Sequence, residues 1–88
     1  MASVEHLLER MRRSKAGWSF ADLEKLYVGL GFEVREGGKH RLYIHPKFPE
    51  LRATVTRSRS LAKGYIEHAL RLAERLKRME AEYYEQQG

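Results

Sequence analysis

The chain has 88 residues, no cysteine, a net charge of +5 and a sequence pI of about 9.7. This length suits one small domain, and the lack of cysteine excludes disulfides and thiolate metal sites. The charged N-terminal stretch is not typical of a signal peptide, and no apolar run reaches the roughly 20 residues that cross a bilayer, so we expect a cytoplasmic protein that does not bind membranes.

The positive charge is concentrated in the middle third of the chain. Residues 35–63 contain eight basic and two acidic side chains, a balance of +6, whereas residues 1–34 are neutral and residues 64–88 carry −1. A local excess of this kind is typical of a surface that binds a polyanion such as RNA. A basic surface that only keeps the protein soluble is the alternative.

Two amphipathic helices are predicted before residue 31. Ser3 can cap the first helix, in which four apolar residues share one face: Val4, Leu7, Leu8 and Met11. The second helix begins after Ser19, an N-cap that Asp22 completes as a capping box. Gly31 is the expected C-terminal stop.

Three short strands follow, because the apolar period changes from 3.6 to 2. The first strand contains Phe32 and Val34, and the glycine pair at 37–38 is predicted as a two-residue hairpin turn. In the second strand, Leu42 and Ile44 are expected to face the helices. The opposite side would then hold three residues: Arg41, Tyr43 and His45.

A third strand and a long helix complete the predicted fold. After the loop PKFPE, the third strand directs three residues inward: Leu51, Ala53 and Val55. The segment 62–85 is a helix whose apolar stripe begins at Tyr65 and ends at Tyr83. The order α-α-β-β-β-α predicts an α+β fold with helices on one face of an antiparallel sheet.

The long helix is expected to extend past the sheet, since some 24 helical residues span about 36 Å and three short strands about 20 Å. Two interpretations of the turns after Leu76 stay open. Either they are solvated and frayed, or Met79 and Tyr83 contact another copy, as a homodimer through this helix, or another protein.

The stretches GLGFEVREGGKHRLYIHP and RATVTRSRSLAKGYIEHAL, with the helix before them, resemble the HicA (YcfA-like) toxins of toxin–antitoxin pairs. The resemblance implies a double-stranded-RNA-binding-like α-β-β-β-α sandwich over residues 18–76 of a single domain. Residues 1–17 would be an N-terminal helix extension, and residues 77–88 an overhang of the last helix. The resemblance also implies that the protein cleaves mRNA and that a HicB-like antitoxin is its partner.

The family's Gly-Ser-His motif corresponds here to Gly38-Lys39-His40, with lysine in place of serine. A second family motif, Val-Pro-x-His, corresponds to residues 55–58, which read VTRS and contain neither proline nor histidine. By the resemblance, His40 is the catalytic residue of a metal-independent endoribonuclease, because a histidine transfers protons near neutral pH.

The candidate site therefore consists of His40 as general acid or base and six residues that contact RNA: Lys39, Arg41, Tyr43, Arg52, Arg57 and Arg59. By strand alternation, His40 falls on the side of Leu42 and Ile44 and is expected to be half covered. No cofactor or metal is expected. Three alternatives stay open: a structural role for His40, a non-catalytic RNA-binding module of the same fold, and an interaction protein that assembles through its long helix.

Overall fold

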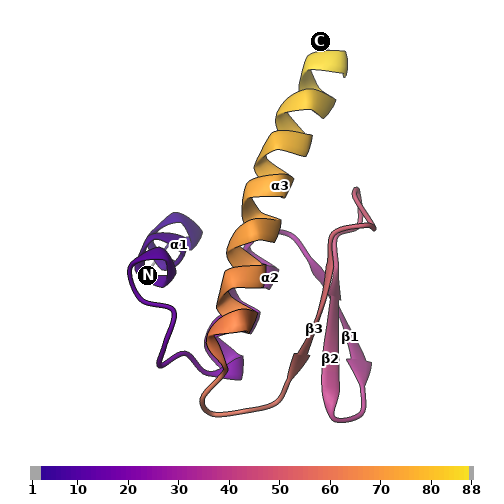
Figure 1. The fold of residues 1–88 in the computed structure, drawn as a ribbon. Coiled ribbons are helices and arrows are strands. Elements are labelled where there is room, and N and C mark those ends of the chain that lie inside the picture. The colour runs from indigo at the N-terminus through magenta and orange to yellow at the C-terminus, as the bar shows by residue number, and fades with distance from the viewer. Residues whose placement is uncertain (1–2, 88) are drawn as a thin grey trace.

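Three helices and three strands follow one another in the computed structural model, which describes residues 3–87 (Figure 1). The order α-α-β-β-β-α and the α+β class predicted from the sequence are confirmed. The elements and their bounds are α1 Val4–Arg13, α2 Phe20–Gly29, β1 Glu33–Gly37, β2 His40–Ile44, β3 Arg52–Thr56 and α3 Lys63–Gln87.

The starts of α1 and α2 are capped as the sequence predicts. The Ser3 hydroxyl accepts the backbone N–H of His6 at 3.2 Å. At α2, the Ser19 hydroxyl accepts the N–H of Asp22, and the Asp22 carboxylate accepts the N–H of Ser19 at 3.0 Å. Each cap satisfies an N–H group that has no partner within the helix.

The end of α2 fixes the direction in which β1 begins. Gly31 has φ 94°, a left-handed conformation that favours glycine. Its N–H donates to the carbonyl of Val28 at 3.0 Å, and the N–H of Phe32 donates to the carbonyl of Tyr27 at 3.0 Å. This pair of bonds is the Schellman motif, which confirms Gly31 as the stop of the helix.

The β1–β2 hairpin turns one residue later than predicted. Gly38 and Lys39 form the turn, between Gly37 at the end of β1 and His40 at the start of β2. Gly38 has φ 66° and Lys39 has a negative φ. These signs are typical of a type II′ turn, which favours glycine at its first central position. The predicted Gly37–Gly38 turn is therefore wrong by one residue.

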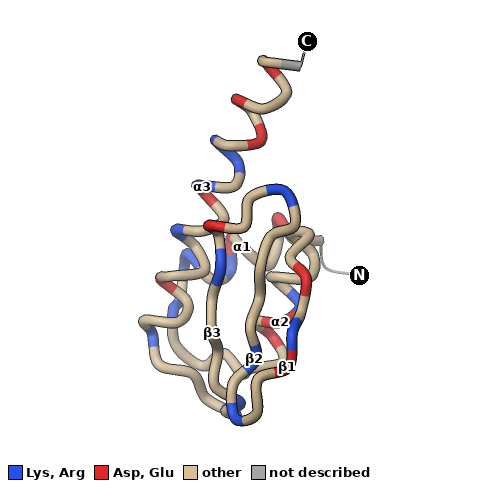
Figure 2. Tube along the Cα trace, turned by 90° about the vertical axis from the view of Figure 1, so that its right-hand side faces the viewer, with Lys and Arg blue, Asp and Glu red and all other residues tan. Residues whose placement is uncertain are grey.

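The three strands form an antiparallel sheet in the order β1-β2-β3. In Figure 1, α2 and α3 lie against one face of this sheet, and α1 packs on the far side of these two helices. Figure 2 views the opposite face, which no helix of the described chain crosses. We call it the open face; strand alternation and register assign nine residues to it: Glu33, Arg35, Gly37, His40, Leu42, Ile44, Arg52, Thr54 and Thr56.

The face prediction for β2 is wrong. Tyr43 is 0% exposed and His45 is 5% exposed, so both point toward the helices. Leu42 and Ile44 are half-buried on the open face instead. The inward direction of Ala53 and Val55 in β3, and of Leu51 before it, is confirmed, because all three are buried.

The core lies between the sheet and the helices and extends under α1. Its largest fully buried side chains are Tyr27, Tyr43, Met11, Leu23, Leu26, Leu51, Ile66, Leu72 and Val55. The Tyr27 and Tyr43 rings stack at 4.8 Å between centroids. Since every layer contributes to this one cluster, the hairpin and α2 are held in a fixed relation, which positions the site below.

Helix α3 has 25 residues and extends well past the sheet, as predicted (Figure 1). Leu76 is the last residue of its buried stripe, and Met79 is half-buried. The helix continues regularly to Gln87. Within residues 3–87, no helix is both long enough and apolar enough to span a bilayer.

Candidate nucleic-acid interface

His40 stands at the edge of the open face, where β2 begins. Its neighbours across the sheet are Gly37 in β1 and Thr56 in β3. The side chain is exposed, because the face on which it lies is the one without helices. His40 does share a side with Leu42, as predicted, but that side points away from the helices, so no helix of the described chain covers His40.

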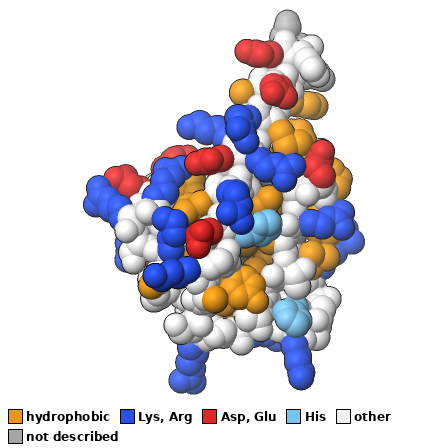
Figure 3. All heavy atoms as spheres, in the orientation of Figure 1, with side chains coloured by type: hydrophobic (Ala, Val, Ile, Leu, Met, Phe, Trp, Pro, Cys, Tyr) orange, Lys and Arg blue, Asp and Glu red, His pale blue; other side chains and the backbone are white. Residues whose placement is uncertain are grey.

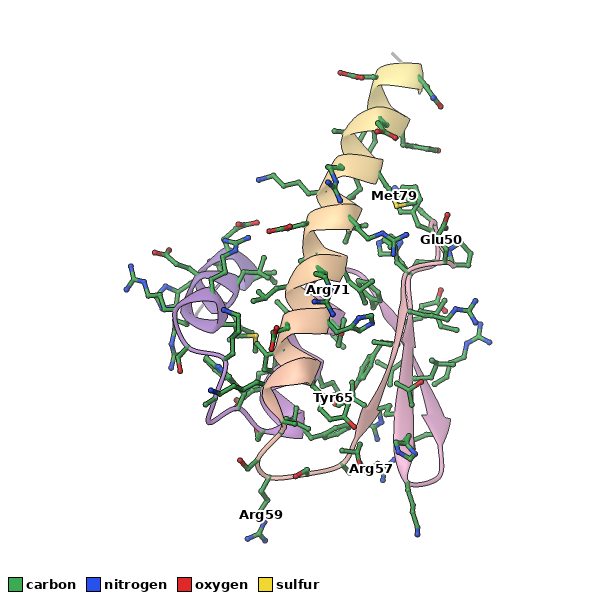
Figure 4. The ribbon with its side chains drawn as sticks, viewed as in Figure 1. Glu50, Arg57, Arg59, Tyr65, Arg71 and Met79 are labelled. Carbon is green, nitrogen blue, oxygen red and sulfur yellow. The ribbon has the colours of Figure 1, made fainter. Side chains whose placement is uncertain are left out.

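Two cations project from the same end of the molecule as His40. We call this the hairpin end and define it by the β1–β2 turn and the β3–α3 loop (residues 37–40 and 57–63). Lys39 is exposed at the tip of the turn, and Arg59 points away from the body in Figure 4. In Figure 3, Lys and Arg side chains extend from this end into solvent. Within residues 3–87, neither Lys39 nor Arg59 forms an ion pair.

The β3–α3 loop is fixed to the start of α2. The N–H of Phe20 donates to the carbonyl of Ser58 at 2.9 Å, and the N–H of Leu61 donates to the carbonyl of Trp18 at 2.8 Å. The Ser58 hydroxyl also accepts the N–H of Ser60 at 3.2 Å. These bonds give the backbone that carries Arg59 a defined position beside the hairpin.

Two of the predicted RNA-binding arginines are paired with carboxylates instead. Arg41 donates to Glu24 at 2.6 Å between Nη1 and Oε1 and also to Glu36. Arg57 donates to the other oxygen of Glu36. The chain Glu24–Arg41–Glu36–Arg57 therefore runs from α2 across the helix-facing side of the hairpin, and it neutralises part of the middle-third charge.

Glu24 is the anchor of this network. Burial favours its neutral acid, but the hydrogen bonds from Arg41 and Tyr43 outweigh that effect and hold the pKa of Glu24 below its ordinary value. Arg41, whose guanidinium lies 5.4 Å from the centre of the Phe20 ring, has a raised pKa because of its hydrogen bond to Glu24. Arg41 therefore helps to hold the hairpin against α2, and its guanidinium is poorly placed to bind RNA.

Tyr43, also predicted to contact RNA, is part of the core. Its hydroxyl donates to Glu24 Oε1 at 2.8 Å, and burial raises its pKa. A ring that is 0% exposed offers no surface to a base, so the predicted outward, base-contacting orientation of Tyr43 is wrong. The physical reason is the reversed face of β2.

Arg52 keeps its predicted place on the open face, and Arg35 joins it from β1. Between them lies a shallow hollow of about 310 Å³, whose lining also includes Ile44, Pro46 and Pro49. Glu33 supplies one carboxylate at this hollow. Arg52 donates through Nε to the carbonyl of Pro49 at 3.1 Å, which orients its guanidinium beside the loop.

A larger hollow of about 840 Å³ lies on the other side of the molecule, between α1 and the start of α2. Leu7, Arg10 and Trp18 are part of its lining, and Arg10 lies 5.1 Å from the centre of the Trp18 ring. Within residues 3–87, its lining contains no histidine and no residue of the β1–β2 turn, so it adds nothing to the chemistry of His40.

Sequence reasoning missed two features of this interface. Arg35 is absent from the predicted site, although its alternation with Val34 in the sequence indicates a side chain on the opposite side of the strand. Glu24 was not singled out, because no local pattern links a residue of α2 to Arg41, 17 positions away.

Comparison with protein family models, with curated proteins and with solved structures finds no match. Within residues 3–87, no group of three or more His, Cys, Asp or Glu side chains is placed to hold a metal ion. The arrangement offers an exposed imidazole, cations without carboxylate partners and a face free of helices.

Proposed function

We propose that this chain binds RNA through the hairpin end and the open face, and cleaves it with His40 as general acid and base. The observation that carries the proposal is the position of His40. It is exposed on the helix-free side of the sheet, next to Lys39, and Arg59 projects from the same end. A phosphate drawn in by these cations would lie within reach of an accessible imidazole.

The arrangement of the interface favours contacts to the RNA backbone. Apart from the His40 imidazole, the open face contains no aromatic side chain on which a base could stack. Cations on a broad surface bind phosphates without reading sequence. We therefore propose recognition of phosphate and sugar, with Lys39, Arg35, Arg52 and Arg59 as the main contacts.

The order of elements supports a HicA-like assignment. The succession α2-β1-β2-β3-α3 is the α-β-β-β-α order of a double-stranded-RNA-binding-like sandwich, and α1 would be the extension at residues 1–17. With this resemblance the proposal extends to a cytoplasmic toxin that cleaves mRNA and is held inactive by a HicB-like antitoxin.

The proposed reaction needs neither metal nor cofactor. His40 takes the proton from a ribose 2′-hydroxyl, and the 2′-oxygen attacks the adjacent phosphorus. The bond to the 5′-oxygen breaks, and the imidazolium returns the proton to that oxygen, leaving a 2′,3′-cyclic phosphate and a 5′-hydroxyl. One such positioned group contributes about 10² to 10⁴-fold in rate, and Lys39 and Arg59 would stabilise the phosphorane charge.

RNA binding without cleavage is the second candidate, and a specific observation favours it. No hydrogen bond from another side chain orients the His40 ring within residues 3–87. Residues 55–58, which read VTRS, also supply no second histidine. A catalytic histidine generally has a partner that fixes its tautomer and direction.

One experiment separates the two candidates. The parent chain, His40→Ala and a matched control, His6→Ala on exposed α1, are incubated with end-labelled mRNA in EDTA, and binding is measured over a range of salt. Cleavage by the parent and by His6→Ala, with cyclic phosphate ends and none from His40→Ala, supports the enzyme.

Salt-sensitive binding by all three proteins without cuts supports the binding module instead. The absence of both binding and cleavage would refute the RNA proposal altogether. Equal circular dichroism spectra and melting curves of the three proteins show that the substitutions leave the fold intact.

A further inference from the structure

The last turns of α3 carry an apolar surface beyond the core. After Leu76, which is 2% exposed, the stripe continues through the half-buried Met79 to Tyr83, 39% exposed, and Tyr84, 56% exposed. These tyrosines are two of the four large hydrophobic residues exposed in the described chain. We call residues 77–87 the overhang. Figure 4 shows Met79 near its start, above the β2–β3 loop that carries Glu50.

The overhang is held in place by that loop. Lys47 Nζ lies 5.6 Å and 5.4 Å from the ring centres of Tyr83 and Tyr84, and its ammonium donates to the Tyr84 hydroxyl at 3.2 Å. The Phe48 ring meets the Tyr83 ring edge to face at 6.3 Å. These contacts give the exposed rings fixed orientations before any partner arrives, which lowers the entropic cost of binding.

The charges along this part of α3 change sign at Met79. Before it, residues 71–78 contain four basic side chains and one acidic, Glu74. After it, residues 80–85 contain three acidic side chains and no basic one. A second helix that runs antiparallel would set its acidic turns against these basic turns, and its basic turns against these acidic ones. A parallel helix would set like charges together.

We propose that the overhang binds a second copy of this chain, antiparallel, across a two-fold axis near Met79. A two-fold interface requires a surface that is complementary to itself, and the sign change at Met79 gives the helix that property. Methionine and tyrosine are among the residues enriched in protein interfaces. The proposal does not depend on RNA binding.

The dimer is expected to be weak. Stable interfaces bury about 800 Å² on each partner, whereas the apolar part of this surface consists of four side chains: Phe48, Met79, Tyr83 and Tyr84. Dimerisation should therefore depend on concentration in the micromolar range or above. It should also weaken with salt, since paired surface charges contribute part of the attraction.

A dimer through the overhangs would leave both hairpin ends accessible. Arg59 and the overhang lie at opposite ends of the molecule in Figure 4, along a principal axis of 43 Å. Two chains joined through their overhangs would present their hairpin ends on opposite outer sides, both accessible. If these ends bind RNA, the dimer can engage two sites on one strand and gain affinity on long RNA.

Sedimentation velocity over a range of concentrations, with two charge-reversed proteins, tests the proposal. One protein carries Glu82→Lys and Glu85→Lys, and the other carries Arg75→Glu and Arg78→Glu; all four positions lie on the solvent-accessible part of α3. We expect the parent to dimerise with increasing concentration and each variant alone to remain monomeric. An equimolar mixture of the two variants should dimerise again, because one overhang is then basic and the other acidic.

The matched control carries Glu5→Lys and Glu67→Lys, the same charge change at exposed positions outside residues 71–87; it should dimerise like the parent. A parent that stays monomeric up to about 1 mM, the weak end of specific affinities, overturns the proposal. So does a parent dimer that both overhang variants retain, because the interface would then lie elsewhere. Identical circular dichroism spectra establish that every variant is folded.

Discussion

The two faces of the sheet have opposite characters, although they alternate along the same strands. The helix-facing side buries Tyr43 in β2, His45 just after it and Val55 in β3, and both the Tyr43 hydroxyl and His45 Nδ1 have hydrogen-bond partners. The open face carries Arg35, His40 and Arg52, which are exposed and form no ion pair within residues 3–87. The difference implies that the helix-facing side stabilises the fold, whereas the open face is available for binding.

Only part of the positive charge excess of residues 35–63 is free to bind RNA. Of the eight basic residues in the middle third, Arg41 and Arg57 are neutralised by Glu24 and Glu36, and Lys47 lies against the tyrosines of α3. The cations that remain are concentrated on the open face and at the hairpin end. A substitution should therefore affect either folding or RNA binding according to the face on which it lies.

The largest effect is expected from Tyr43→Ala on the buried face. It removes a fully buried ring that stacks on Tyr27, and truncation of a large buried aromatic costs about 3–5 kcal/mol. Chemical denaturation should show this loss in the free energy of unfolding. Tyr43→Phe, which keeps the ring and loses only the bond to Glu24, should lose about 1–2 kcal/mol. A stable Tyr43→Ala would contradict the assignment of this face to the core.

The next largest effect is expected on the open face, from Arg35→Ala combined with Arg52→Ala. Free energies of unfolding should stay within about 0.5 kcal/mol of the parent. The slope of log RNA affinity against log salt concentration should become shallower by about two, one for each phosphate that no longer meets an arginine. The control, Arg12→Ala with Lys25→Ala on α1 and α2, removes the same charge away from this face. An equal loss of binding in the control would show that net charge, not the open face, determines affinity.

The sequence contains enough information to predict which side of β2 faces the helices, although the side predicted above is wrong. Leu42 and Ile44 are more apolar than Tyr43 and His45, so hydrophobicity alone assigned them to the core. Any two-residue turn, whether at 37–38 or at 38–39, pairs even-numbered residues of β1 with odd-numbered residues of β2. The side of Phe32 must then also be the side of Tyr43 and His45.

The helix ends were predicted well because their signals are local. The capping box of Ser19 and the stop at Gly31 depend on residues at most five positions apart. By contrast, the bonds from Arg41 and Tyr43 to Glu24 join residues 17 and 19 positions apart. They depend on how α2 lies over the hairpin, which only tertiary packing determines, so the commitment of Arg41 to structure was not predictable.

A smaller effect, this time dependent on pH, is expected at the buried His45. The burial of this ring between Phe32 and Phe48 lowers its pKa, and Lys47 lowers it further, whereas Glu80 opposes the shift. The unfolded chain, with a histidine pKa of about 6.5, therefore takes up a proton before the folded chain does. The contribution of His45 to stability is complete above about pH 6.5 and is lost as the pH falls through the folded value.

Thermal melts of the parent and of His45→Phe between pH 8 and pH 4.5 measure this contribution. The variant keeps an aromatic ring between Phe32 and Phe48 but cannot titrate, so its melting temperature should fall less on acidification. Thr54→Ala, at an exposed position on the other face, should retain the pH dependence of the parent. If His45→Phe and the parent respond identically, His45 is not the group that titrates.

The smallest loss of stability is expected from Glu36→Gln on the helix-facing side of β1, and RNA binding should become stronger. The Glu36 side chain is 62% exposed, and ion pairs at such sites contribute at most about 1 kcal/mol. The substitution releases Arg57, whereas Arg41 keeps its bond to Glu24. RNA affinity should therefore rise, and the slope of log affinity against log salt concentration should become steeper by about one. Glu5→Gln, the same charge change on α1, should leave both unchanged; weaker binding by Glu36→Gln would instead mean that Glu36 holds Arg57 in the orientation that RNA requires.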